Sequence, residues 1–310
     1  MRRLGCALLC LALCLSGCGG TQPQETKGED ISQIQQTAAP ESGELVLLYT
    51  NDIFGAYAPS AAGSLGCAAV AGYRKMLEDA GKTVVLLDGG DVFDGSAQAD
   101  ADAVAAVGEM LETAGYDFAV PGDRDLTLGL DTLASGALNY VCCTLMDGAS
   151  GNTVFPGYRL EQYGDTTVAF VGITIPAKGV SGFETDGEKF YQQIQSAIDS
   201  ARLEGAEYVI ALGHTGMEPG DTPYTTAEII ANTAGVTVYL DGHSNSVFCG
   251  EKLWDSEDKK VPVFANPEGL SSFMAVTLEL DSGNVTGQRI TAWEEADATT
   301  RTAVEELTDG

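Results

Sequence analysis

Positive charge is scarce in this chain of 310 residues, which has 16 Lys and Arg against 45 Asp and Glu and a formal net charge of −29. A protein without a basic surface cannot neutralise the phosphates of a nucleic acid, so we expect no nucleic-acid partner. The acidity fits a protein that stays soluble at a surface, or one that holds cations. A general excess of acidic surface residues would explain most of it.

Cysteine is also sparse outside the N-terminus. Of the eight cysteines, three lie within residues 1–17 and a fourth is Cys18. The other four contain no Cys-x-x-Cys pair, so the sequence indicates neither a disulfide scaffold nor a zinc ribbon. An exported protein could still form a disulfide among them, and the sequence leaves that pairing open. These four are Cys67, Cys142, Cys143 and Cys249.

The apolar run at residues 4–15 is too short to span a bilayer as a stable helix. It follows a short basic start and ends in Leu-Ser-Gly directly before Cys18. This arrangement resembles the lipobox of bacterial lipoproteins, which are cut before the cysteine that then carries the lipids. We therefore expect a signal peptide at residues 1–17 and a lipid anchor at Cys18, on the outer face of a membrane in the bacterial cell envelope. An ordinary secretory signal is the alternative.

Residues 18–43 are polar and predict a flexible tether between the anchor and the folded part. From residue 44 the pattern alternates between short apolar runs and helical periodicity, with no internal repeat and no break in composition. The 44% hydrophobic content supports a substantial core. We predict one α/β (α+β) domain at residues 44–293, with hairpins that make its sheets mixed, and a C-terminal tail at 294–310.

Local pattern predicts the following elements. Helices are expected at residues 67–80, 100–114, 130–135, 188–204 and 225–234. Strands are expected at residues 45–49, 84–87, 116–120, 140–145, 158–163, 167–173, 208–212, 236–240, 261–265, 274–280 and 288–293. The dipeptide at 164–165 and the Ser-Gly-Asn at 282–284 predict hairpin turns.

Aspartate and histidine recur just past the predicted strand ends. The chain has only two histidines, and each follows a short apolar strand and a glycine. Open α/β sheets place their ligands at the carboxyl ends of strands, and imidazole with carboxylate suits zinc, manganese or iron. The alternative is that these residues form no functional site: the aspartates would be turn residues and the histidines ordinary surface or core residues. The residues concerned are Asp52, Asp91, Asp123, His214 and His243.

The segment Tyr49-Thr50-Asn51-Asp52-Ile53-Phe54-Gly55 resembles the opening motif of the calcineurin-like metallophosphoesterases, in their 5′-nucleotidase branch. Four further motifs of that family are matched in order by residues 88–91 with Gly95-Ser96, and by residues 122–125, 213–214 and 242–245. The resemblance implies a four-layer αββα sandwich of two mixed sheets, of the metallo-dependent phosphatase-like fold. It also implies two metals on the loops at one edge.

The resemblance is incomplete at the first of these metals. Its histidines are replaced by Phe54 and Asn245, and only Asp52 and Asp91 remain. Phenylalanine cannot ligate, and an amide is a poor ligand for a transition metal. The second set, with Asp in place of the family's Asn, is Asp91, Asp123, His214 and His243. We therefore expect one divalent transition metal, which would be Zn, Mn or Fe.

Arg124 stands where the family has its acid/base histidine, and Thr127 replaces the aspartate partner of that histidine. Arginine cannot transfer a proton near neutral pH, but its planar fork can hold a phosphate. We expect Arg124 to stabilise developing charge as the catalytic residue, and to lie within salt-bridge reach of Asp52. The alternative is that it points to solvent.

Together these features predict a surface-anchored phosphoester hydrolase that acts on a small molecule through one metal site. The alternative is a non-catalytic pseudo-phosphatase lipoprotein, retained for binding or structure. Proteins of the 5′-nucleotidase branch carry a further domain that stacks the nucleoside base, and residues 294–310 leave no room for one. Nothing in the sequence therefore supports nucleotide selectivity.

Overall fold

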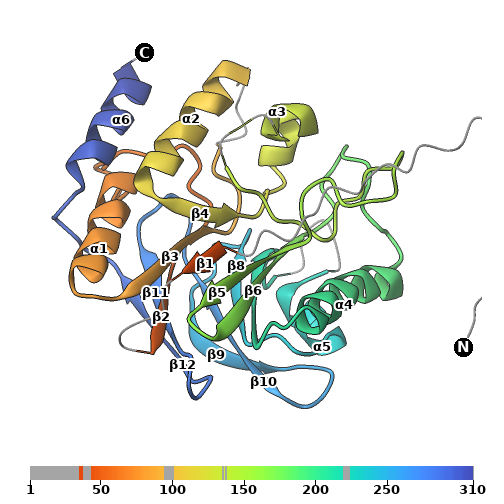
Figure 1. Ribbon diagram of the computed structural model, residues 1–310. Helices are drawn as coiled ribbons and strands as arrows, with labels where there is room; N and C mark the ends of the chain where they lie inside the picture. Colours follow the sequence, from red (N-terminus) through yellow and green to blue (C-terminus); the bar gives the residue numbers. More distant parts are fainter. Residues whose placement is uncertain are drawn as a thin grey trace, which may run out of the picture. The chain divides into compact units, whose positions relative to one another are not determined.

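The computed structural model describes residues 35–37, 43–93, 101–134, 136, 138–218 and 224–309 (Figure 1). The predicted signal peptide, the anchor Cys18, most of the predicted tether and the Gly95-Ser96 pair lie outside these residues. Within them, no helix combines the length and the apolar character that a membrane crossing requires.

Two mixed sheets form the centre of the domain. One has the order β12–β11–β2–β3–β4, with parallel pairing of β2, β3 and β4. The other has the order β1–β5–β6–β7–β8–β10–β9, with parallel pairing of β6, β7, β8 and β10. The strands of the first sheet are β2 (Glu44–Thr50), β3 (Thr83–Asp88), β4 (Tyr116–Ala119), β11 (Phe273–Glu279) and β12 (Val285–Ile290). Those of the second are β1 (Gln35–Thr37), β5 (Tyr158–Tyr163), β6 (Thr166–Thr174), β7 (Tyr208–His214), β8 (Val238–Gly242), β9 (Phe248–Trp254) and β10 (Lys260–Ala265).

Helices cover the outer face of each sheet, which confirms the predicted four layers. α1 and α2 pack on the first sheet with α6 packed against them, and α4 and α5 pack on the second (Figure 1). A short turn of helix, η1, and α3 follow β4. The helices are α1 (Cys67–Asp79), α2 (Ala101–Ala114), η1 (Asp125–Leu128), α3 (Leu130–Ala134), α4 (Gly187–Leu203), α5 (Thr226–Asn232) and α6 (Ala298–Asp309).

The alternation of side chains along the strands produces three apolar cores. On β2, Leu45 and Leu47 face the space between the sheets, whereas Val46 and Leu48 face the helices α1 and α2. Because both faces are covered, the strand is a continuous apolar run rather than an alternating one. Between the sheets, strands from each side meet at close range, as Phe118 and Phe170 do with ring centroids 5.1 Å apart.

The predicted strand at residues 140–145 is wrong. This buried run forms isolated bridges, and its backbone bonds to both sheets in turn: the N–H of Val141 donates to Ala119 and that of Cys143 to Gly172. An apolar run signals burial, but it does not distinguish a strand from a segment that crosses between layers.

Four observed elements were not predicted: the short helix η1, β9, α6 and β1. β9 lies at the edge of its sheet, and none of its residues is buried. α6 begins after Asp297, whose carboxylate accepts the N–H of Thr300 as an N-terminal cap, and it packs on α1 and α2. It occupies the segment expected only as a C-terminal tail. β1 falls within the segment expected as a tether and pairs with β5 through its backbone.

All four cysteines beyond Cys18 are free thiols. Three are buried and one is exposed on β9, so the structure pairs none of them. The free cysteines are Cys67, Cys142, Cys143 and Cys249.

Candidate metal centre

The parallel strands of both sheets end at one edge of the domain, and the loops that follow them carry the polar side chains. Asp52 follows β2, Asp91 follows β3 and Asp123 follows β4. From the second sheet, His214 is the last residue of β7, and His243 follows β8 directly. Each of these five residues therefore lies where the sequence predicted it.

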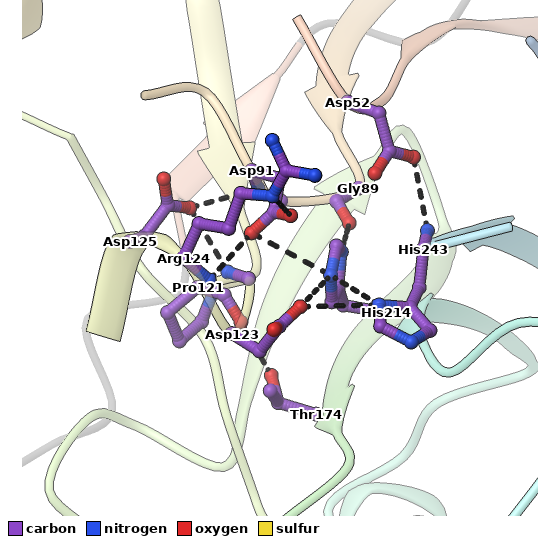
Figure 2. Close-up of polar contacts among 12 residues, drawn as sticks. Asp52, Gly89, Asp91, Pro121, Asp123, Arg124, Asp125, Thr174, His214 and His243 are labelled. Carbon is purple, nitrogen blue, oxygen red and sulfur yellow. Dashed lines mark hydrogen bonds and ion pairs between the residues drawn. The ribbon is translucent and has the colours of Figure 1, made fainter. Parts of the chain in front are cut away.

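Three of the five, Asp123, His214 and His243, bring a ligand atom to one point, and Asp91 approaches the His214 ring beside them (Figure 2). Nε2 of His214 and Nδ1 of His243 each lie 3.1 Å from Oδ1 of Asp123, and the two nitrogens are 3.2 Å apart. Oδ1 of Asp91 lies 3.6 Å from Nε2 of His214. A tetrahedral metal with bonds of about 2.0–2.1 Å has its ligand atoms about 3.3 Å apart. The spacing and the donor types fit a divalent transition metal.

The orientation of His214 is set by a backbone contact. Its Nδ1 lies 2.8 Å from the carbonyl oxygen of Gly89, which can only accept, so Nδ1 carries a proton. In the neutral ring Nε2 then has the lone pair that a metal needs. Such a contact on the far nitrogen is usual for histidines that bind metals. His214 is fully buried, and the ring of His243 packs against it edge-on.

The pKa values show how the same groups balance their charges without an ion. Burial raises the pKa of Asp91 to about 7. Burial opposes the charge of Asp123 too, but hydrogen bonds from His214 and His243 bring its pKa well below the ordinary value. Burial alone would lower the pKa of His214, yet Asp91 and Asp123 raise it well above the usual range. A bound metal would replace the proton that these carboxylates otherwise favour on His214.

Backbone strain is concentrated at this edge. Of the six non-glycine residues with positive φ in the described part of the chain, four lie here: Asp52 (φ 50°), Phe54 (φ 49°), Asp91 (φ 57°) and His243 (φ 74°). Such conformations cost free energy and persist mainly where they serve a site. The strain is therefore independent support for a functional centre at these loops.

Asp52 acts on the site through the backbone. Its Oδ2 accepts the N–H of His243 at 2.9 Å and the side-chain amide of Asn51 at 2.7 Å. It thereby holds the left-handed turn that aims the His243 ring. Asp52 also forms a second group of potential ligands with Asp91 and His214.

Asp125 is a site residue whose role the sequence reasoning missed. Its buried carboxylate accepts the backbone N–H groups of Asp91 at 2.9 Å, Gly122 at 2.9 Å and Phe93 at 3.1 Å. It ties the loop after β3 to the loop after β4. The signal was present, because Asp125 closes the motif at residues 122–125.

The two glycines before Asp91 have distinct uses. Gly90 has φ +90°, and a Cβ there would lie 2.7 Å from the backbone nitrogen of Gly122 and 2.8 Å from Nδ1 of His214. A Cβ on Gly89 would collide with the hydroxyl of Tyr49. The loop can therefore approach its neighbours only with glycine at both positions.

Asn245 and Arg124, which stand where the resembling family has histidines, make different contacts in the structure. Asn245 is exposed, and its Oδ1 accepts the N–H of Glu268 at 3.2 Å. Arg124 was expected near Asp52, and that expectation is wrong: its Nε lies 3.6 Å from Oδ2 of Asp91. Its guanidinium carbon lies 3.9 Å from the ring centroid of Phe54. The aromatic face holds Arg124 beside Asp91, with 47% of its side chain exposed.

Comparison with known proteins places this geometry in context. No family model matches the chain. The sequence is 25% identical to a 5′-nucleotidase of Bos taurus over 225 residues, covering 66% of this chain and 38% of that protein. It is 26% identical to a 5′-nucleotidase of Vibrio vulnificus over 260 residues, covering 76% and 44%. The chain thus spans less than half the length of these relatives.

Solved structures show the same fold. A 5′-nucleotidase precursor from Thermus thermophilus superposes with a TM-score of 0.69 at 18% identity, over 86% of this chain and 58% of that one. The calcineurin-like phosphoesterase YfkN from Bacillus subtilis gives 0.65 at 17% identity, over 86% and 97%. The architecture is the calcineurin-like metallophosphatase fold, with distant sequence similarity to 5′-nucleotidases.

Proposed function

We propose that this calcineurin-like metallophosphatase domain hydrolyses small phosphoesters with one divalent transition metal, held by Asp91, Asp123, His214 and His243. The observation that supports it most is the spacing of 3.1–3.2 Å among the ligand atoms of Asp123, His214 and His243, with Asp91 3.6 Å from His214. The metal itself would supply Lewis-acid activation of the phosphoester and of the attacking water. Its identity among Zn, Mn and Fe is left to the test.

The residues around the metal group position its ligands and could bind the phosphate. Gly89 fixes the His214 ring, Asp52 fixes His243, and Asp125 joins the two loops that carry the carboxylates. Arg124 is half-exposed beside Asp91, where its guanidinium can bind phosphate oxygens through parallel hydrogen bonds. It can stabilise negative charge that develops on the phosphoryl group.

Among the described residues, the site has no histidine outside the metal group that could protonate the leaving group. The chain has two histidines, and both belong to the metal group. Arg124 does not release its proton near neutral pH. We therefore propose that the preferred substrates are phosphoesters whose leaving group departs as an anion without a proton.

Hydrolysis of aryl phosphates tests this function directly. With added Mn²⁺ or Zn²⁺, we expect turnover of p-nitrophenyl phosphate that exceeds turnover of phenyl phosphate, because nitrophenolate leaves without a proton. His243→Ala should remove the activity, whereas Asp131→Ala, at an exposed position on α3, should leave it unchanged. Adenosine 5′-monophosphate belongs in the same assay, since the relatives are named 5′-nucleotidases. Equal rates for the two aryl phosphates would contradict the proposed leaving-group preference.

A non-catalytic role is the second candidate, and the contact between Arg124 and Phe54 favours it. The Arg124 guanidinium and the Phe54 ring lie beside Asp91, and neither of them can bind a metal or transfer a proton. A domain of this kind would bind a metal and a phosphate without turnover. Retention of both by a protein inactive on every ester tested would support this role over the hydrolase.

We also propose that the protein is anchored by lipid at Cys18 on the outer face of a bacterial membrane. Leu-Ser-Gly-Cys after a short apolar run supports the cleavage and acylation. Two or more acyl chains give stable anchoring where one does not. In fractionated cells we expect the protein with the membranes and the Cys18→Ala variant largely released from them. Equal membrane retention of both would exclude Cys18 as the anchor.

A further inference from the structure

A second group of ligand atoms adjoins Asp123, His214 and His243 and shares His214 with them, and Asp91 of this second group lies 3.6 Å from His214. Asp52, Asp91 and His214 each offer an atom within 4.8 Å of the others, and all three residues are buried. We infer that the Arg124 guanidinium is the fixed second cation of this centre, so that the domain binds one metal ion and excludes another. This inference uses the metal group of the proposed function but does not depend on turnover.

The second group lacks a nitrogen ligand of its own. Nε2 of His214 is committed to the first group, 3.1 Å from Asp123 and 3.2 Å from His243. Its Nδ1 is bonded to the carbonyl of Gly89. One imidazole lone pair cannot serve two ions, so the second group is reduced to carboxylates.

One of those carboxylates is already partly used. Oδ2 of Asp52 accepts two hydrogen bonds, from Asn51 and from the backbone of His243. Among the described residues, Phe54 has no donor atom, and Asn245 is exposed and bonded to the backbone of Glu268. Two carboxylates alone form a weak site for a transition metal.

Arg124 supplies the missing positive charge through Asp91. Its backbone N–H donates to Oδ1 of Asp91 at 2.9 Å, and its Nε lies 3.6 Å from Oδ2. Oδ1 is also the oxygen that faces His214. The Asp91 carboxylate therefore faces His214 through Oδ1 and the Arg124 side chain through Oδ2 (Figure 2).

Phe54 fixes the position of this cation. The guanidinium carbon lies 3.9 Å from its ring centroid. The backbone of Phe54 is itself held, since its N–H donates to the carbonyl of Asp91 at 3.0 Å. One metal ion and one guanidinium carry three positive charges, which match the carboxylates of Asp52, Asp91 and Asp123. Two ions beside Arg124 would instead leave like charges close together.

Metal stoichiometry tests the inference without any activity assay. Each protein is saturated with Mn²⁺ or Zn²⁺, freed of excess by gel filtration and analysed for metal per chain. We expect one ion in the wild type and one in the Phe54→His/Asn245→His variant, because the new imidazole ring at position 54 can stack on the guanidinium as Phe54 does and so keep Arg124 beside Asp91. Adding Arg124→Ala to that variant should raise the content to two.

The matched control replaces a different arginine. Arg289 on β12 is exposed, and Arg289→Ala in the same two-histidine background should leave the content at one. Two ions with Arg124 present would overturn the inference, and so would one ion after its removal. In every variant the first ion must remain, which shows that the centre has folded. An inactive wild type with one ion would count against the hydrolase and leave this inference standing.

Discussion

His214→Ala should abolish stoichiometric metal binding. The His214 side chain is fully buried, whereas that of His243 is partly exposed. The second ring nitrogen of His214 is fixed by the carbonyl oxygen of Gly89. The loss of His214 removes one of four ligands and leaves Asp91 and Asp123 without the ring between them. Loss of a group that merely supports a ligand costs up to about a hundredfold in affinity, so loss of the ligand itself should cost at least that. Titration against a chelating indicator measures it.

A control is needed because His214→Ala also leaves a cavity in β7. Leu212→Ala makes a cavity in the same strand at a side chain that is equally buried but carries no ligand atom. It should cost about 2–5 kcal/mol of unfolding free energy and keep the metal. If both variants lose the metal alike, the loss reflects unfolding, and His214 is not shown to be a ligand. If His214→Ala keeps wild-type affinity, the metal group is wrong.

Asp125→Ala should cause a large loss of stability. Three backbone N–H groups, those of Asp91, Phe93 and Gly122, would lose the buried carboxylate to which they donate. Each unpaired buried donor costs about 1–3 kcal/mol, so we expect at least about 3 kcal/mol. Asp125→Asn should cost less, because one oxygen remains to accept. Urea unfolding monitored by circular dichroism gives the free energies.

The matched control for this measurement is Asp131→Ala, an exposed aspartate a few residues further along the chain. It should change the free energy of unfolding by no more than about 0.5 kcal/mol, as surface substitutions usually do. An Asp125→Ala variant as stable as Asp131→Ala would show that Asp125 does not hold the two loops together. A large stability loss together with weaker metal binding would confirm that it positions Asp91.

The residues of the metal group could be predicted because their signal is local. Each follows a buried strand at a tight turn, and parallel strands of a sheet end at a common edge. Asp91 illustrates this: the apolar run of β3 and the two glycines after it are sufficient to place the side chain at the mouth of the sheet. His214 and His243 follow from the same reasoning on β7 and β8.

The contacts that tune the site could not be predicted, because they join positions distant in sequence. Arg124 could be expected to meet a carboxylate, but the choice of Asp91 over Asp52 depends on the Phe54 ring that holds the guanidinium. In the fold, residues 140–145 have the composition of a strand, yet their backbone bonds are shared between two sheets. Burial is encoded in composition, whereas pairing partners are not.

The most direct test of the single-metal centre is elemental analysis of the purified wild-type protein after saturation with Mn²⁺, Zn²⁺ or Fe²⁺ and removal of excess ion. Asp91, Asp123, His214 and His243 predict one ion per chain. A content near zero with all three metals would show that their convergence is not a metal site. A content near two would show that Arg124 does not take the place of the second ion.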